Sequence, residues 1–285
     1  MKLEDIQIRD PFFLKDGSKW YLYGTTDHNP WDGPGTGFDC YVSNDQMQTF
    51  TRKSVFRPNL DFWGKENFWA PEVREFDHGY LMTASFKGTK GRGVQLLMAP
   101  RPEGPFLAIG NEAVTPSGQD CLDGTIWIED NRLFLIYSHE WTQCIDGEIC
   151  LLELDQATFY RIGQPEILFR ASDAPWTVFH EEQGKQGFVT DGPFIWRLST
   201  GRLAMIWSSF SSSGYSMGVA YSDHGVHGPW IQQQKPLYDK NGGHGMLFRF
   251  QDDLMLAIHV PNTPGKERVQ LFQVREEKNQ LKLGG

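Results

Sequence analysis

Three aspartates, each followed by proline or glycine, are the residues of this chain best suited to acid–base chemistry. Asp10, Asp123 and Asp191 each open an apolar segment that ends in a polar turn. Carboxylates that share a pocket repel one another, so the pKa of at least one rises while another stays ionised. Each aspartate taken alone is better explained as part of an ordinary turn. Their matching positions in three repeated units favour one shared site.

Such a set could supply a general acid and a general base to a glycosidic bond. The acid protonates the departing oxygen, and the base activates a water on the opposite face of the sugar. A separation of roughly 6.5–9.5 Å between the two leaves room for the water and inverts the configuration. A third carboxylate beside the acid keeps the pKa of the acid high and orients it. The sequence therefore predicts an inverting hydrolase.

The acidic phrases belong to a unit that occurs five times. Each copy runs from a polar phrase into an apolar strand, a tight turn and a second apolar strand, which is typical of β-hairpins. The copies start at Asp10, Ala70, Asp123, Asp191 and His244, and their turns lie at residues 16–19, 77–79, 129–132, 199–202 and 251–253. Spacings of roughly 52 to 68 residues are typical of four-stranded propeller blades.

We therefore predict an all-β fold, a five-bladed β-propeller, as a single domain over residues 1–285. No segment of ten or more residues has helical periodicity, and glycine and proline mark no boundary because they are spread along the chain. Radial repeats aim equivalent positions at one axis. The polar residues that start the innermost strands should gather there: Asp10, Glu72, Asp123, Asp191 and His244. For Glu72 and His244, a structural role in the channel is the competing interpretation.

The amino-acid composition argues against some classes of binding partner. The 27 basic and 36 acidic residues give a net charge of −9, which argues against nucleic acid or an anionic membrane as the main partner. Aromatic residues make up 14% of the chain, including 10 tryptophans. Sheet cores favour such side chains, and a stacked sugar ring is the alternative explanation.

The cysteines and the first residues indicate the compartment. Cys40, Cys121, Cys144 and Cys150 lack the spacing of a zinc site. Free thiols are favoured over a Cys144–Cys150 disulfide. Residues 1–5 begin no apolar segment, and no run of about 18 apolar residues follows, so we expect a cytoplasmic protein. A secreted protein supplied without its leader would have the same sequence.

Several motifs together resemble glycoside hydrolase family 43. They are Asp10-Pro11-Phe12, Phe68-Trp69-Ala70-Pro71-Glu72-Val73, Asp123-Gly124-Thr125 and Gly242-Gly243-His244-Gly245, within a match that spans about residues 8 to 260. Members are five-bladed propellers that act by inversion, mostly on arabinofuranosides and xylosides. The resemblance implies that Asp10 is the general base and that Asp123 tunes and orients the acid. It also implies a calcium or other cation in the channel near His244, and no cofactor for the chemistry.

One departure concerns the general acid. The family usually has glutamate before Gly-Pro or Ala-Pro, whereas this chain has Asp191-Gly192-Pro193. Aspartate is one methylene shorter, so either the backbone lies further inward or the proton reaches less far. Asp191 is the predicted acid, with Glu181 or Glu182 as the alternative. A propeller that binds sugar without cleaving it is the alternative of another class.

Aromatic residues near the same strand ends are candidate sugar contacts. The predicted substrate-binding residues are Trp31, Phe68, Trp69, Trp141 and Arg268, with Trp63 as a further loop aromatic. Core packing competes with this role for Phe68 and Trp69, and surface pairing competes for Arg268. The expected substrate is an arabinose- or xylose-containing oligosaccharide, and the predicted activity is that of an exo-α-L-arabinofuranosidase. A β-xylosidase or a galactan-directed hydrolase is the alternative.

Overall fold

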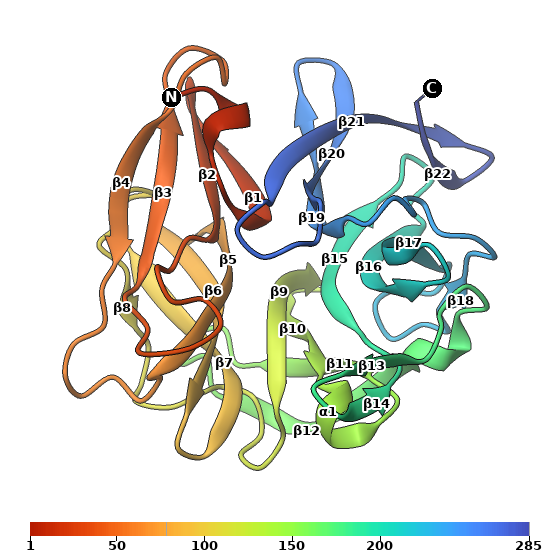
Figure 1. Ribbon diagram of the computed structural model, residues 1–285, viewed down its shortest axis with the longest axis horizontal. Helices are drawn as coiled ribbons and strands as arrows, with labels where there is room; N and C mark the ends of the chain where they lie inside the picture. Colours follow the sequence, from red (N-terminus) through yellow and green to blue (C-terminus); the bar gives the residue numbers. More distant parts are fainter. Residues whose placement is uncertain (78, 285) are drawn as a thin grey trace.

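Five four-stranded antiparallel sheets form a ring in the computed structural model, which describes residues 1–77 and 79–284 (Figure 1). The predicted five-bladed β-propeller is confirmed. The innermost strands of all five blades line a cavity of about 670 Å³. One predicted turn, residues 77–79, includes His78, which lies outside the described residues.

Each blade is built from one continuous stretch of chain, innermost strand first. Blade 1 contains β1 (Arg9–Asp16), β2 (Lys19–Thr25), β3 (Phe38–Ser43) and β4 (Thr51–Phe56). Blade 2 contains β5 (Glu66–Phe76), β6 (Gly79–Gly88), β7 (Gly91–Ala99) and β8 (Leu107–Ala108). Blade 3 contains β9 (Cys121–Glu129), β10 (Arg132–His139), β11 (Glu148–Leu154) and β12 (Arg161–Arg170). Blade 4 contains β15 (Asp191–Arg197), β16 (Leu203–Ser211), β17 (Gly214–Ser222) and β18 (Ile231–Gln232). Blade 5 contains β19 (Gly243–Phe250), β20 (Asp253–Val260), β21 (Arg268–Glu277) and β22 (Gln280–Leu283).

Several short elements lie in the connections within and between the blades. They are the 3-10 turns η1 (Leu3–Asp5) and η2 (Ala171–Asp173), the one-turn helix α1 (Trp141–Cys144), and a hairpin of β13 (His180–Glu182) and β14 (Lys185–Gly187). Among the described residues, no helix is long and apolar enough to cross a membrane. All four cysteines are free thiols.

The ring closes where blade 5 meets blade 1 (Figure 1). The Ile8 amide donates to the carbonyl of Glu267 at 3.3 Å. The side chain of Glu267 is fully buried and pairs with Arg9 at 2.9 Å. Among the described residues no strand of one blade joins the sheet of the other, although an isolated antiparallel bridge links Gln7 to Arg268. Side chains and single backbone contacts therefore carry the closure.

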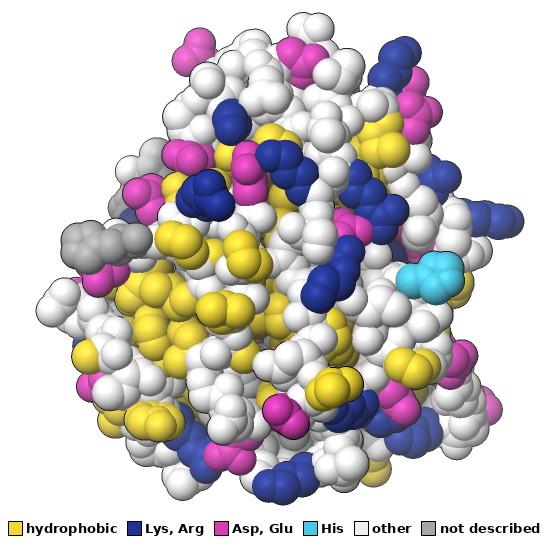
Figure 2. Space-filling view, turned by 90° about the vertical axis from the view of Figure 1, so that its left-hand side faces the viewer, with side chains coloured by type: hydrophobic (Ala, Val, Ile, Leu, Met, Phe, Trp, Pro, Cys, Tyr) yellow, Lys and Arg dark blue, Asp and Glu magenta, His cyan; other side chains and the backbone are white. Residues whose placement is uncertain are grey.

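Aromatic rings fill much of the interior between the sheets. Phe38, Phe56, Phe62, Phe68 and Phe86 pack against one another at centroid distances of 4.7 to 6.1 Å, many of them edge to face. This arrangement agrees with the core interpretation of the aromatic content. Figure 2 shows the side of the ring formed by blades 1 and 2, where apolar side chains gather in one area among charged ones.

Every innermost strand begins with the same irregularity. One residue has positive φ and precedes proline or glycine, and the pairing with the second strand shifts there. The five residues are Asp10 (53°), Ala70 (47°), Asp123 (57°), Gly192 (52°) and His244 (42°). Positive φ is uncommon for residues other than glycine, so this conformation must be held by its surroundings.

This register corrects the predicted equivalence of the five polar residues. Asp10, Asp123 and His244 do occupy equivalent positions. Asp191 pairs with Ser208 one position earlier, and Glu72 lies two positions after Ala70. The strand-initial phrases looked alike in sequence because proline or glycine follows each of them, but the bulge displaces the acidic residue in blades 2 and 4.

Hydrogen bonds between blades hold the positive-φ residues. In four blades the amide of this residue donates to a side chain near the end of the second strand of the preceding blade. The pairs are Ala70 to Thr25 (2.9 Å), Asp123 to Ser85 (2.8 Å), His244 to Ser208 (2.8 Å) and Asp10 to His259 (3.3 Å). At blade 4 the Gly192 amide instead donates to the Asp123 carboxylate at 3.0 Å. The equivalent hydroxyl, Ser138, has no hydrogen-bond partner among the described residues.

Candidate active site

Two of the predicted aspartates meet at one histidine. Nδ1 of His244 lies 3.2 Å from Asp10 and 3.6 Å from Asp123. The three side chains come from β1, β9 and β19, the innermost strands of three blades. All three are buried, with 6 to 8% of each residue exposed. The equivalent positions therefore converge as the repeat predicted.

Asp10 is surrounded by groups that favour its ionised form. Burial alone would raise the pKa of Asp10, but the neighbouring His244 and Arg9 lower it below its ordinary value. The hydroxyl of Thr25 also donates to its carboxylate at 2.5 Å. Asp10 therefore remains a carboxylate at neutral pH and can accept a proton.

His259 supports Asp10 as a neutral ring. Burial and the neighbouring Arg9 lower the pKa of His259 to about 3. Nδ1 accepts the Asp10 amide proton, and Nε2 lies 3.3 Å from the Asn262 side-chain oxygen. These contacts are compatible with the tautomer that carries its proton on Nε2. His259 thus fixes the backbone at Asp10.

Asp191 has the opposite electrostatic setting. Burial raises the pKa of Asp191 to about 7, and the charge of Asp123 adds to that rise. The hydroxyl of Tyr215 donates to its Oδ2 at 3.0 Å. Unlike Asp10 and Asp123, Asp191 is partly exposed. It can therefore hold a proton near neutral pH and present it to a bound molecule.

Asp123 connects the two other aspartates. Burial, followed by the charge of Asp10, raises the pKa of Asp123 to about 8. Its Oδ2 accepts the amide proton of Gly192, the residue next to Asp191. Asp123 thus acts on Asp191 both through space and through the backbone. Asp10 is therefore ionised, while the neighbouring carboxyls of Asp123 and Asp191 form a pair that holds protons near neutral pH. The site thus offers both a base and a protonated acid, which is what acid–base cleavage of a glycosidic bond needs.

Glu72 lies in the channel with structural partners. The Thr125 hydroxyl donates to it at 2.7 Å, and Arg74 lies 3.7 Å away. The Arg74 guanidinium lies over the rings of Phe12 and Phe194. Burial raises the pKa of Glu72 to about 7. These contacts favour the structural interpretation of Glu72.

Trp31 and Trp69 form an aromatic pair that contacts Arg9, the neighbour of Asp10. Trp31 is 42% exposed, and its ring lies 5.6 Å from that of Trp69. Arg9 lies over Trp31 at 4.8 Å and Arg92 lies over Trp69 at 4.2 Å. Arg9 also neighbours Asp10, which links the pair to the carboxylates. The stacking role predicted for both tryptophans is compatible with this placement.

Two other predicted aromatic contacts are corrected. Phe68 is fully buried among phenylalanines, 4.7 Å from Phe86, so it is a core residue and cannot stack on a sugar. Trp141 is 7% exposed and packs edge to face against His180. It offers no open face in this structure. Both residues lie beside loops in sequence, but the chain folds their rings inward.

The remaining predicted contacts lie further out. Arg268 begins β21, is partly exposed and donates to the carbonyl of Glu267 at 2.8 Å. Glu181 and Glu182, the alternative acids, are exposed on the β13–β14 hairpin, and Gln186 donates to Glu181 at 2.8 Å. Among the described residues, no hydrogen bond or ion pair joins either glutamate to Asp10 or Asp123, whereas Asp191 is joined to Asp123 through Gly192.

The cation predicted from the family resemblance would lie in the channel near His244. Nδ1 of His244 faces the two carboxylates, and its ring lies close against Gly192. Among the described residues, one group of His, Cys, Asp and Glu ligand atoms lies close enough to hold a metal, and it consists of His139, Cys144 and Glu148. A cation in the channel near His244 stays a prediction.

Sequence reasoning missed four residues that support the aspartates: Thr25, Tyr215, His259 and Asn262. Thr25 could have been found, because Thr25, Ser85, Ser138 and Ser208 occupy equivalent positions at the ends of second strands. A hydroxyl repeated at that place is a readable signal. Tyr215 and Asn262 have no counterpart in the other repeats, so no pattern in this sequence marks them.

Comparison with known proteins identifies the family of this chain. The family model for glycosyl hydrolases family 43 matches residues 5–274. A solved endo-arabinase from Bacteroides thetaiotaomicron VPI-5482 is similar over 98% of both chains, with 35% identity and a TM-score of 0.91. A thermostable family-43 glycoside hydrolase covers 98% of this chain and 93% of its own, with 25% identity and a TM-score of 0.81. An α-L-arabinofuranosidase from Lactobacillus brevis shares the fold, with 16% identity, 99% and 97% coverage and a TM-score of 0.75. The chain belongs to glycosyl hydrolase family 43, a family of inverting enzymes that act on plant polysaccharides.

Proposed function

We propose that this glycoside hydrolase cleaves α-L-arabinofuranosyl bonds, with Asp10 as general base and Asp191 as general acid. The observation that carries the proposal is the opposite setting of the two carboxyls. His244 and Arg9 keep Asp10 ionised, while burial and Asp123 keep a proton on Asp191. Asp123 fixes the backbone of the acid through the Gly192 amide.

In this mechanism a water beside Asp10 loses its proton to the carboxylate as it attacks the anomeric carbon. Asp191 gives its proton to the departing glycosidic oxygen, so the carbon–oxygen bond breaks without release of an alkoxide. The sugar leaves with inverted configuration. The Trp31–Trp69 pair would stack against the furanose or a neighbouring sugar.

The names of two similar proteins support arabinose as the sugar. The 35% identical structure is named an endo-arabinase, and the Lactobacillus brevis protein an α-L-arabinofuranosidase. Release of terminal arabinose is the prediction from sequence, and cleavage within the chain is the second candidate because of the first of these names. One fold serves several sugars, so the substrate must be measured.

Two assays test the proposal. Rates on nitrophenyl α-L-arabinofuranoside, β-xyloside and β-galactoside identify the sugar, and we expect the arabinofuranoside to be fastest. Products from linear arabinan then identify the mode: arabinose alone indicates terminal release, whereas short oligosaccharides indicate internal cleavage. A clear preference for xyloside or galactoside contradicts the arabinose assignment.

Asp10→Asn tests the base. We expect turnover to fall by about 10²–10⁴-fold or more with the fold intact, because the asparagine amide cannot accept the water's proton. Asp252→Asn, which changes an exposed turn carboxylate, serves as the control and should keep its activity. A normal rate for Asp10→Asn would remove Asp10 from the mechanism.

A further inference from the structure

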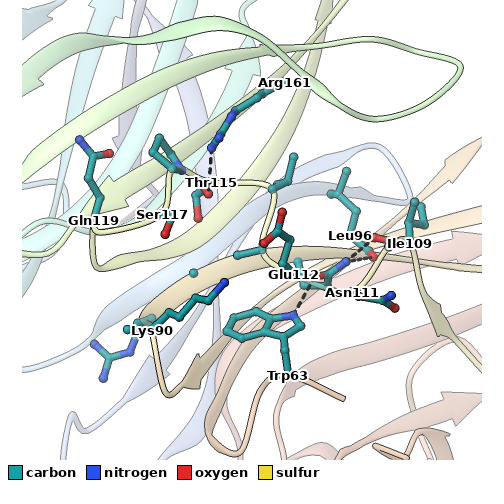
Figure 3. Close-up of a pocket in the computed structure, with 18 of the residues that line it drawn as sticks. Trp63, Lys90, Leu96, Ile109, Asn111, Glu112, Thr115, Ser117, Gln119 and Arg161 are labelled. Carbon is teal, nitrogen blue, oxygen red and sulfur yellow. Dashed lines mark hydrogen bonds between the residues drawn. The ribbon is translucent and has the colours of Figure 1, made fainter. Parts of the chain in front are cut away.

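A second cavity opens between blades 2 and 3, and none of the three aspartates lines it. It has a volume of about 620 Å³ and is lined by loop residues 61–65, the β6–β7 turn, residues 109–119 and residues 158–161. In Figure 3 the indole of Trp63 lies on one side with Lys90 and Glu112 near it, and Arg161 lies across from them. We call this cavity the Trp63 groove. Its volume lies within the range of roughly 300–1,000 Å³ that small-ligand sites occupy.

Trp63 is a rigid part of this groove. Its indole N–H donates to Gln95 Oε1 at 2.9 Å, and Gln95 is held in turn by the backbone carbonyls of Leu96 and Ile109 (Figure 3). The edges of Phe62 and Phe86 pack against it. An aromatic side chain fixed before binding loses little conformational entropy when a ligand stacks on it.

The rest of the lining offers polar groups of both signs. Lys90, Asn111 and Glu112 are exposed, and Arg161 and Asp61 also border the groove. The cations of the lining are Lys65, Lys90, Arg92 and Arg161, its acids are Asp61 and Glu112, and Glu140 pairs with Arg92. Amide, ammonium and carboxylate groups can all hydrogen-bond to hydroxyls. The Trp63 indole, surrounded by such groups, can bind a neutral ligand that has apolar ring faces and many hydroxyls.

The groove ends near the catalytic residues without merging with them. Arg92 lines it, and the Arg92 guanidinium pairs with Glu140 and donates to Asn67 at 3.1 Å. Arg92 also stacks on Trp69, which belongs to the aromatic pair beside Asp10. Arg92 thus touches both the groove and the Trp31–Trp69 pair, so a ligand in the groove would lie near the catalytic residues.

We propose that the Trp63 groove is a second carbohydrate-binding site that holds a segment of a neutral polysaccharide. Trp63 stacks against a sugar ring, and Asn111, Glu112 and Lys90 bind its hydroxyls. The choice of a neutral polysaccharide rests on the proposed function of the catalytic site. A bound segment would raise the local concentration of the same polymer at the carboxylates.

Affinity electrophoresis in gels that contain linear arabinan, xylan, galactan or polygalacturonate tests the proposal. We expect the protein to be retarded by a neutral polysaccharide and Trp63→Ala to bind it about tenfold more weakly. Ile231→Ala, an exposed apolar residue on β18 of blade 4, is the control and should bind like the wild type. The rate on the nitrophenyl glycoside should stay within about twofold in both variants, because a small substrate does not reach the groove.

The outcomes separate this proposal from the catalytic one. Retardation that depends on Trp63 in a protein that hydrolyses nothing supports the groove and contradicts the proposed function. Hydrolysis with equal retardation of wild type and Trp63→Ala overturns the groove, as does retardation by polygalacturonate alone. Trp63→Ala also loses core contacts, so the exposed pair Asn111→Ala and Glu112→Ala provides a second test. This double variant should bind several-fold more weakly, and unchanged binding overturns the assigned contacts.

Discussion

At the scale of single residues, two hydrogen bonds fix the position of Asp191, the general acid with the shorter side chain. Asp191 stands where family 43 usually has glutamate, so its carboxyl reaches one methylene less far from the backbone. Two contacts fix its position: the adjacent Gly192 amide is bound by Asp123, and Tyr215 donates to its Oδ2. Burial raises the pKa of Tyr215, so this hydroxyl remains a donor at every pH at which the enzyme works.

Removal of the acid should affect substrates unequally. Asp191→Ala should lower kcat on arabinan by about 10²–10⁴-fold, since the departing sugar oxygen needs a proton. A dinitrophenyl glycoside, whose leaving group needs little protonation, should lose far less. Steady-state rates on the two substrates check this difference. Equal losses on both would assign the proton to another residue, and Glu181→Gln and Glu182→Gln would then be the variants to compare.

The pH dependence should follow the two aspartates. kcat/KM should persist down to about pH 4, because the pKa of Asp10 lies below its ordinary value, and should fall near pH 7 as Asp191 loses its proton. Asp123 and Asp191 are neighbouring carboxyls, and the pair holds its last proton more tightly because two adjacent negative charges repel. Asp123→Asn removes that repulsion, so the alkaline limb should move to lower pH. Tyr215→Phe removes a hydrogen bond that stabilises the ionised form, so the limb should move to higher pH.

These opposite shifts distinguish an effect of Asp123 and Tyr215 on the pKa of Asp191 from a general loss of structure in the variants. We expect about half a pH unit or more in each direction, measured as kcat/KM between pH 3 and 9. Loss of rate without a shift, or shifts of the same sign in both variants, would show that Asp123 and Tyr215 do not act through the proton of Asp191.

At the scale of elements, the strands were predictable and the bulges were not. Alternating apolar runs and polar turns are local signals, and they gave both the hairpins and the number of blades. The shift that separates Asp191 from the position of Asp10 depends on pairing with the second strand, which no single strand encodes. The inward packing of Phe68 likewise depends on neighbours from other segments, including Phe38 and Phe86.

The hydrogen bonds between blades allow a matched stability test. Ser85→Ala removes the acceptor of a buried Asp123 amide, and an unsatisfied buried amide costs about 1–3 kcal/mol. Ser138→Ala removes a hydroxyl that has no hydrogen-bond partner among the described residues, so its free energy of unfolding should change little. Urea denaturation of both variants gives the comparison. Equal losses would contradict a holding role for these bonds.

At the scale of the whole molecule, the junction of blades 1 and 5 depends on few groups. Buried Glu267 pairs with Arg9, and Gln7 donates to it at 3.1 Å. The repeat predicted the ring, but the residues that close it lie outside the repeated phrases, so the sequence did not identify them. Arg9 is the neighbour of Asp10, which joins closure of the ring to the catalytic centre.

Glu267→Ala should therefore destabilise the protein strongly. It leaves the Arg9 charge buried without its partner, a change that costs about 3–5 kcal/mol. Glu66→Gln, which alters an exposed pair with Lys87, is the control and should change stability by less than about 1 kcal/mol. Thermal unfolding measures both. A small effect in Glu267→Ala would mean that other contacts carry the closure.

The continuous blades have a consequence for how the enzyme fails. His244 helps to keep Asp10 ionised, and His259 holds the backbone of Asp10 in place. Both histidines belong to blade 5, at the opposite end of the chain from Asp10. If blades 1 and 5 separate, Asp10 can no longer activate the water, although every sheet remains folded. As the urea concentration rises, catalytic activity should therefore be lost before the circular dichroism signal changes. Activity would then report whether blades 1 and 5 are still in contact.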